Sequence, residues 1–395
     1  MRSFKFNSLA LTSTRYAGVA ASAAMLFSST GCNRKQEVAA PPKPPAPTKI
    51  SDADLTKYKP NEAGAVMVLM YHRISSKEPD NDLNRRPDTF RKDLETLYKK
   101  GYRPVTALEF VENRMDVPAG KTPVVITFDD ALPTQFHIKT SAADKAVIDR
   151  DCAVGIMQKF HEKHADWATK ATFFVLPKEG LNTDPFGQSE TVSDKFSFLA
   201  KNGYEIANHT STHSNMRGMT ADKVRKELAT AVRRVKEIVP DASMQTLALP
   251  YGKLPRRPEA QQALLGGADG GTNYANKAVF QAAWRPNLSP VTRKDQSASD
   301  GGRLCPFDPA RLERIKADAR NPSTPGVLEY WIKWFDTNPS SRYISDGNLN
   351  IVAVPAAHKN SVDAARISAQ GKILHIYGGD SSVGSKSGGS SLGVE

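Results

Sequence analysis

The sequence predicts an α/β fold, either a (β/α) barrel or a doubly wound parallel sheet. Short apolar runs of strand length recur along the chain, and segments with helical spacing of apolar residues lie between them. Near-continuous apolar runs suit strands that are covered on both faces, as in a parallel sheet. These runs are residues 66–71, 124–128, 171–176 and 204–207.

The helical segments carry recognisable start and stop residues. Phe90, Leu94 and Leu97 share one face of a predicted helix, with Asp88 as its cap and Gly101 as its stop.

Two further helices begin at threonine residues. Thr106 and Glu109 have the spacing of a capping box, which opens a second helix. Thr220 is the expected cap of a third helix, whose lysines and arginines we expect on a solvated face. The buried stripe of that third helix would be Val224, Leu228, Val232 and Val235.

Composition fits a globular protein, and the charge surplus has a local origin. Of 395 residues, 39% are hydrophobic and 24% charged, with 54 Lys and Arg against 42 Asp and Glu, a net charge of +12. Residues 1–49 hold seven basic residues and one acidic residue, so they contribute +6 of that total. The remaining +6 is spread over residues 50–395 and gives no reason to expect nucleic-acid binding.

The N-terminus has the features of an export signal. Three basic residues precede an apolar stretch at 16–27, which is too short to span a bilayer but suits a secretory signal. Small residues at 29–31 then lead to Cys32, as in a bacterial lipobox. We therefore expect an exported cell-envelope protein that contacts the membrane only through a lipid on Cys32. Ordinary signal cleavage, with loss of Cys32, is the alternative.

The predicted organisation is a signal segment at 1–32, a proline-rich tether at 33–63, one domain at 64–377 and a disordered Gly/Ser-rich tail at 378–395. The part after about residue 255 either completes the domain or adds a small appended one. In an oxidising compartment Cys152 and Cys305 could pair, and the sequence leaves that pairing open.

Two pairs of reactive side chains follow predicted strands, where α/β enzymes keep functional groups. Asp129 and Asp130 end one apolar run, and neighbouring residues on a strand point opposite ways, so the two carboxylates can serve different roles. His209 and His213 follow another run, and imidazoles four residues apart can converge on one metal ion. A turn or helix cap at the carboxylates, and two polar loop histidines, are the alternatives without chemistry.

Two more strand ends belong to the same predicted edge. A turn of sequence Pro-Tyr-Gly follows residues 247–249, and a backbone N–H there, that of Tyr251, can serve an oxyanion. His72 follows the first apolar run. His161 and His164 lie among charged neighbours and are expected on the solvated surface.

Taken in order, the strings M-Y-H-R-I, T-F-D-D, H-T-x-x-H and P-Y-G resemble those of the NodB-type polysaccharide deacetylases, carbohydrate esterase family four. The resemblance covers about residues 64–255. It implies a distorted (β/α) barrel and a divalent metal, usually zinc. By the resemblance, the metal ligands would be Asp130, His209 and His213, a set that leaves the open position a hydrolytic zinc needs.

The resemblance also implies roles for other residues. Asp129 would be the general base, and the Tyr251 N–H would help to hold the oxyanion. The general acid would be His72, as in relatives that act on poly-β-1,6-N-acetylglucosamine, or His375 of a late Leu-His string, as in other branches. We favour His72 because its motif matches better.

The chain departs from the family pattern at two places. Many relatives have arginine two residues before the proline of the Pro-Tyr turn, where it orients the base, whereas this chain has Ala248. Arg285 or Arg293 would be the substitutes. The segment after Asp130, residues 131–136, lacks the commoner glycine.

The sequence therefore predicts a metal-dependent hydrolase that removes N-acetyl groups from an N-acetylhexosamine-containing envelope or extracellular polysaccharide. The alternatives are an O-acetyl esterase acting on xylan or another glycan, and a catalytically silent glycan-binding lipoprotein.

Overall fold

The computed structural model describes residues 50–141, 143–177, 184–295, 302–317 and 323–378. The chain divides into two units, Met1–Thr48 and Lys49–Glu395, and the described residues all belong to the second. The expected signal segment, Cys32, most of the tether and the tail after residue 378 lie outside the described residues. No helix in the described part of the chain is long and apolar enough to cross a membrane.

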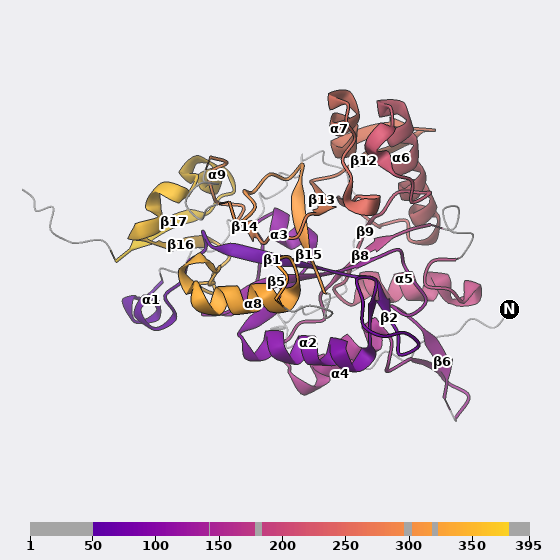
Figure 1. Cartoon of the computed structure of the whole chain (residues 1–395), viewed down its shortest axis with the longest axis horizontal. Helices are drawn as coiled ribbons and strands as arrows, with labels where there is room; N and C mark the ends of the chain where they lie inside the picture. The colour runs from indigo at the N-terminus through magenta and orange to yellow at the C-terminus, as the bar shows by residue number, and fades with distance from the viewer. Residues whose placement is uncertain (1–49, 142, 178–183, 296–301, 318–322, 379–395) are drawn as a thin grey trace, which may run out of the picture. The chain divides into compact units, whose positions relative to one another are not determined.

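A closed ring of parallel strands forms the centre of this unit (Figure 1). The ring closes because β1 pairs with β5 over five consecutive residue pairs, from Met67 with Val124 to Tyr71 with Phe128. The predicted (β/α) barrel is thereby confirmed, and the doubly wound sheet is excluded. In order around the ring, the strands are β1 (Ala65–Tyr71), β15 (Leu312–Lys316), β13 (Ala278–Ala282), β10 (Thr246–Ala248), β9 (Glu205–Asn208), β8 (Thr172–Val175) and β5 (Thr122–Asp129).

The ring strands are buried along their whole length or nearly so, which explains why their sequences read as near-continuous apolar runs. Side chains from neighbouring strands meet inside the barrel, where one core cluster gathers Val66, Val125, Phe174, Ala207 and Phe280. Two further strands pair with ring strands without being part of the ring. Strand β4 (Tyr102–Val105) pairs with β5, and β14 (Asn287–Leu288) pairs antiparallel with β1.

Helices surround the barrel, and their ends test the predicted caps. Thr106 and Glu109 form the predicted capping box, and the Thr220 side chain accepts the predicted capping hydrogen bond. Asp88 was the wrong cap, because Pro87 occupies the first helical position and Arg86 precedes it. The helices are α2 (Pro87–Lys99), α3 (Ala107–Val111), α4 (Ala153–Lys163), α5 (Val192–Lys201), α6 (Ala221–Ile238), α7 (Pro258–Leu265) and α8 (Leu328–Thr337).

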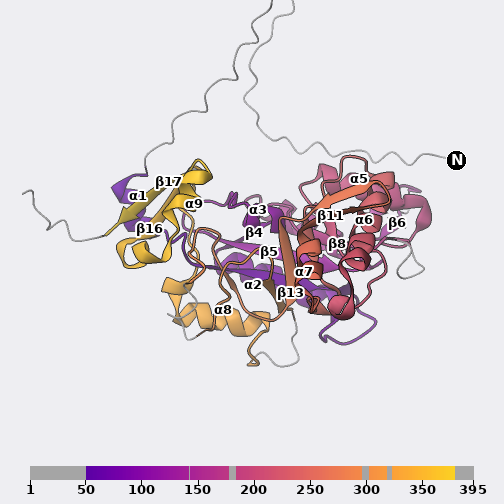
Figure 2. The same cartoon turned by 90° about the horizontal axis from the view of Figure 1, so that it is seen from above.

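The part after residue 255 both completes the barrel and adds a small sheet. Strands β13 and β15 belong to the ring, whereas β16 (Ile351–Pro355) and β17 (Ile373–Tyr377) form a separate parallel pair with α9 (Ala364–Ala369) beside it. This small sheet lies at one end of the unit, and α6 and α7 lie at the other (Figures 1 and 2).

Residues expected in the tether are partly folded. Helix α1 (Asp52–Tyr58) precedes β1, and the Tyr377 hydroxyl of the small sheet donates a hydrogen bond of 2.8 Å to the Pro60 carbonyl. The Glu62 N–H donates to the Ala353 carbonyl at 3.0 Å. The folded unit therefore begins before residue 64, where the sequence placed its start.

The two cysteines of the described chain are not bridged. Cys152 and Cys305 are both buried free thiols. Cys152 caps α4, where its sulfur accepts the Gly155 N–H at 3.4 Å. The disulfide that the sequence left open is therefore not formed in this structure.

Candidate active site

The carboxyl ends of three ring strands carry the predicted reactive side chains to one mouth of the barrel. His72 follows β1, Asp129 ends β5 and Asp130 follows it. His209 and His213 lie in the loop after β9. Because all ring strands are parallel, these ends meet on the same side of the barrel.

Three of these side chains converge on a single point. The ligand atoms of Asp130, His209 and His213 all lie within 4.8 Å of one another. The Asp130 Oδ1 atom is 3.3 Å from His209 Nε2 and 3.5 Å from His213 Nε2. One carboxylate and two imidazoles in this arrangement form a donor set suited to a divalent metal such as zinc.

The hydrogen bonding of His209 supports that reading. Its Nδ1 atom lies 2.8 Å from the carbonyl oxygen of Ala248, which can only accept, so Nδ1 carries the proton. In the neutral imidazole, the lone pair of Nε2 then faces Asp130 Oδ1 at 3.3 Å, whereas in the imidazolium Nε2 carries a proton toward that oxygen. The facing Nε2 and Oδ1 atoms can share either a proton or a divalent cation, so the site fits a metal bound to neutral His209.

A glutamate on α6 holds the histidine loop in place. The Glu227 carboxylate accepts hydrogen bonds from the backbone N–H and hydroxyl of Ser211, at 3.1 and 2.8 Å. It also accepts from the N–H and hydroxyl of Thr212, at 2.9 and 2.6 Å. Thr210 and His213 in this loop have positive φ angles of 71° and 54°, which are costly for residues with a Cβ. The four bonds to Glu227 stabilise this otherwise unfavourable backbone.

The second carboxylate, Asp129, is held by an arginine from β15, which is separated from β5 in the ring only by β1. Arg314 on β15 donates from Nη1 to Asp129 Oδ1 at 2.6 Å and from Nη2 to Oδ2 at 2.8 Å. Only 1% of the arginine side chain and 3% of the aspartate side chain are exposed. Two parallel bonds of this kind fix both the position and the orientation of the carboxylate.

Arg314 replaces the arginine that the chain lacks at position 248, and the substitutes expected from the sequence were wrong. Arg285 instead pairs with Glu313, and Arg293 pairs with Asp295. The available signal was an arginine within the strand Leu312–Lys316, next to the apolar residue Ile315, because a buried arginine requires an anionic partner.

These neighbours shift the pKa values of the site. Burial alone would raise the pKa of Asp129, but Arg314, with His209 and His72, holds it well below its usual range. Burial also opposes protonation of His209, yet the two carboxylates raise its pKa. Burial lowers the pKa of His72 and of His213. In the metal-free protein His72 is therefore a neutral imidazole at neutral pH.

A short loop after the carboxylate pair joins two of the strand ends. The Gln135 side-chain amide, which is fully buried, donates to the backbone carbonyls of His72 at 2.9 Å and Asp129 at 2.5 Å. Asp130 and Ala131 have φ angles of 76° and 51°. The sharp turn for which relatives use glycine is thus made here by residues that carry a Cβ.

The remaining predicted residues lie in different places. Tyr251, in the short helix η3 (Pro250–Gly252), has its ring centroid 4.9 Å from that of His213 and is 62% exposed, so it borders the mouth. The oxyanion role of its N–H stays a prediction. His72 Nε2 lies 3.8 Å from Asp129 Oδ2.

His375 does not join the site. It pairs with Ala353 in the small sheet and interacts electrostatically with Asp346, whose N–H donates to Glu62 at 3.3 Å. Glu62 precedes β1, whereas His72 follows it, so His375 lies toward the opposite end of the barrel. Of the two candidate general acids, the structure brings only His72 to the carboxylates.

The other histidine pair is more structural than the sequence suggested. His161 Nδ1 is 2.6 Å from the Trp167 carbonyl oxygen. The ring of His164 packs 4.1 Å from that of Tyr98, and its side chain is 14% exposed. The expectation of two solvated side chains was therefore wrong.

Replacing Glu227 with alanine is expected to weaken metal binding at Asp130, His209 and His213. The four donors of Ser211 and Thr212 would lose their acceptor, and loss of such a supporting group typically costs about 10–100-fold in metal affinity. Zinc affinity, measured by competition with a chromophoric chelator, checks this. Glu237→Ala on the same helix is the matched control, because Glu237 is paired with Arg234. Equal affinities for the two variants would contradict the supporting role.

Comparison with known proteins agrees with the motifs. Residues 116–267 match the family model described as polysaccharide deacetylase. That segment contains Asp129, Asp130, His209 and His213, whereas His72 and Arg314 come from outside it.

Solved structures of deacetylases are among the similar folds. A Streptococcus pyogenes deacetylase, PplD, solved with acetate, is 18% identical with a TM-score of 0.45, over 65% of this chain and 93% of that one. IcaB from Ammonifex degensii is 16% identical with a TM-score of 0.43, over 68% of this chain and 97% of that one. The polysaccharide deacetylase BC0361 from Bacillus cereus is 15% identical with a TM-score of 0.45, over 70% and 69%.

The family match covers the segment that carries both carboxylates and both histidines, and the same motifs occur in the order that the sequence indicated. Residues 116–267 of the chain therefore match the polysaccharide deacetylase family, in agreement with the NodB-type motifs of the sequence.

Proposed function

We propose that this protein is a metal-dependent hydrolase that removes N-acetyl groups from an N-acetylhexosamine-containing polysaccharide. The observation that carries the proposal is the pairing of two carboxylates with different surroundings. Asp130 faces two imidazoles, whereas Asp129 is held by Arg314 beside them. This division suits a site in which one carboxylate binds a metal and the other moves a proton.

A divalent metal, most simply zinc, held by Asp130, His209 and His213 would supply a Lewis acid that acidifies water and polarises the acetyl carbonyl. Asp129 takes a proton from the water that attacks the carbonyl carbon. Because its pKa is held low, the carboxylate stays ionised and ready to accept throughout the neutral range. The Tyr251 N–H donates to the oxygen on which negative charge develops.

The leaving nitrogen must then gain a proton. The Nε2 atom of His72 lies 3.8 Å from Asp129 Oδ2, and the ring is neutral at neutral pH because burial lowers its pKa. His72 can accept the proton that Asp129 has taken from water and deliver it to the nitrogen as the carbon–nitrogen bond breaks. The products are acetate and the free amine of the sugar. The hydroxyl group of one water molecule is added to the acetyl carbon, and its remaining proton is delivered to the nitrogen.

Asp129→Asn is expected to lower kcat by about 10²–10⁴-fold, since the general base is lost while the metal ligands remain. Acetate release from chito-oligomers, β-1,6-linked oligomers and peptidoglycan, with added zinc or cobalt, measures it. Chelation should abolish activity, and added metal should restore it. Activity that survives both the substitution and thorough chelation would contradict the mechanism.

Arg314→Met is expected to shift the pH profile of the enzyme. Asp129 must be ionised to act, so activity is lost as pH falls through its pKa. Arg314 lowers that pKa, and without it burial raises the pKa, by roughly 1–3 units. The acid limb of kcat should therefore move to higher pH by about that amount. Arg285→Met, which removes a partner of Glu313, is the control. Superimposable profiles for Arg314→Met and wild type would contradict the assignment.

The neutral state of His72 favours a second candidate, hydrolysis of O-acetyl esters on xylan or another glycan. An alkoxide leaves more readily than an amine and depends less on a general acid. His72→Ala would then cost little on an ester substrate, with no acetate released from amides by either protein. A large loss on amides instead supports the N-deacetylase.

We also propose, from residues 1–49 alone, that the protein is exported and anchored to the cell envelope by a lipid on Cys32. Cys32→Ala should then move the protein from the membrane fraction to the soluble fraction of cells that express it. Unchanged membrane association would refute the anchor.

A further inference from the structure

A second cavity lies far from the catalytic mouth. It has a volume of about 700 Å³, within the range of small-molecule sites. Its walls come from α1, the segment after α8 and the ends of β16 and β17. Asn61, one of its lining residues, pairs with Ile344 just before β1 begins. Since β1 rises about 3.3 Å per residue, the cavity and His72 are separated by roughly 20 Å.

One buried polar atom in this cavity lacks a partner. Asn61 is 5% exposed, and its Nδ2 donates to the carbonyls of Ser340 at 2.8 Å and Arg342 at 3.4 Å. These two carbonyls fix the orientation of the amide, because a flipped group would place its oxygen against them. The Oδ1 atom has no hydrogen-bond partner within the described residues. A buried acceptor left without a donor costs about 1–3 kcal/mol, which a ligand hydroxyl would relieve.

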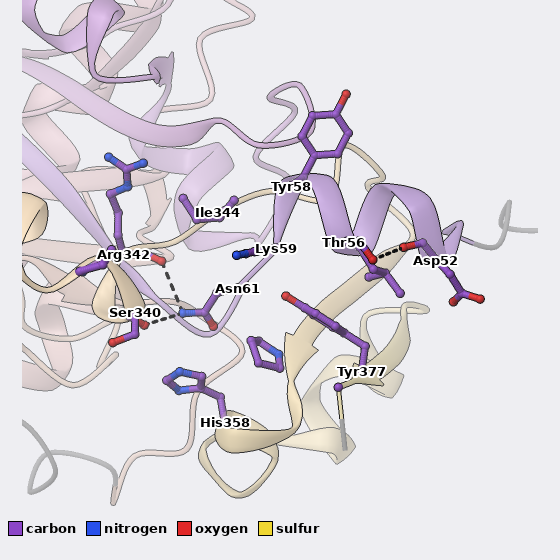
Figure 3. Close-up of a pocket in the computed structure, with 14 residues that line it drawn as sticks. Asp52, Thr56, Tyr58, Lys59, Asn61, Ser340, Arg342, Ile344, His358 and Tyr377 are labelled. Carbon is purple, nitrogen blue, oxygen red and sulfur yellow. Dashed lines mark hydrogen bonds between the residues drawn. The ribbon is translucent and has the colours of Figure 1, made fainter. Parts of the chain in front are cut away.

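The other walls define what kind of molecule would fit. Figure 3 shows Asn61, His358 and Tyr377 around the same opening. His358 is half-buried and burial lowers its pKa, so at neutral pH it offers one N–H donor and one nitrogen acceptor. The Tyr377 ring is fixed by its hydroxyl bond to Pro60, and Ile344 adds apolar surface.

A sugar ring matches these features. It has an apolar face that packs on an aromatic or aliphatic wall, and hydroxyls that both donate and accept. A free hydroxyl would donate to Asn61 Oδ1, and another would exchange hydrogen bonds with His358. Lys59 and Arg342 line the cavity as well, and the carboxylate of Asp52 lies on the outer side of α1 in Figure 3, so the interior disfavours a cationic unit such as a deacetylated hexosamine.

We propose that this cavity is a second glycan-binding site, which holds an N-acetylhexosamine unit of the same polymer that is deacetylated at the barrel mouth. The inference rests on the proposed function for the identity of the polymer. A chain bound at both places gains affinity through effective concentration, whereas a fragment too short to reach both sites does not. The cavity would therefore act on binding of long substrates and not on the chemical step.

The test compares a trisaccharide with a long polymer of the same N-acetylhexosamine, using the full chain loaded with zinc. His358→Ala combined with Lys59→Ala removes two polar lining groups. We expect KM for the polymer to rise about tenfold, equivalent to about 1.4 kcal/mol. We expect kcat on both substrates, and KM for the trisaccharide, to stay at the wild-type values.

His161→Ala combined with Lys201→Ala, which changes one histidine and one lysine away from both sites, is the matched control. Thermal unfolding verifies that both double variants are folded. An unchanged KM for the polymer in the His358 variant would overturn the second site. Failure of wild type to release acetate from the trisaccharide would instead overturn the proposed function.

A direct binding measurement tests whether the cavity binds a sugar or the C-terminal segment of this chain. Addition of the trisaccharide to wild type should shift the side-chain amide NMR signal of Asn61, and the His358 variant should reduce the shift. Gly378 lines the cavity and the chain continues beyond it, so a form ending at Gly378 is tested alongside. Binding that occurs only in the shortened form would assign the cavity to the chain's own end and overturn the proposal.

Discussion

The bond between Arg314 and Asp129 is the contact on which the site depends. It joins β15 to β5 across the barrel interior, and both partners are almost completely buried. Removing one partner of such a pair typically costs roughly 3–5 kcal/mol, because the other charge is left without compensation. The closed ring supplies the geometry for this bond: β1 lies between β15 and β5, so the sheet must close before arginine and carboxylate can meet.

The sequence predicted the parts of the site that are local. Asp129 and Asp130 adjoin one strand, and His209 and His213 share one loop, so their relation follows from short spacing. The parallel strands were also foreseeable, since apolar runs buried on both faces indicate them, whereas the choice of a barrel over a doubly wound sheet rested on the family resemblance. Thr106 and Thr220 were correct caps for the same reason, because a cap is a contact over three residues.

The contacts that the sequence missed are those between distant segments. Arg314 is 185 residues from Asp129, and nothing in the spacing of either strand reveals the pairing. Glu227 lies on α6, where only the lysines and arginines were predicted to form a solvated face, and the contact of its carboxylate with the histidine loop was not foreseen. For His375 the sequence predicted a contact that does not form. Its Leu-His motif indicated a place in the site, but the residue lies in the small sheet, away from the site. In each case, topology decides which segments meet.

The hydrogen bond from His209 to the Ala248 carbonyl has a consequence for substitutions at position 248. Because the acceptor belongs to the main chain, the bond does not depend directly on the side chain at position 248, although Ala248 itself is fully buried in the barrel core. Once Arg314 supplied the guanidinium from another strand, an arginine at 248 was no longer required for orientation of the base. The side chain at 248 is therefore limited by core packing and not by catalysis, whereas the backbone carbonyl there supports the centre directly.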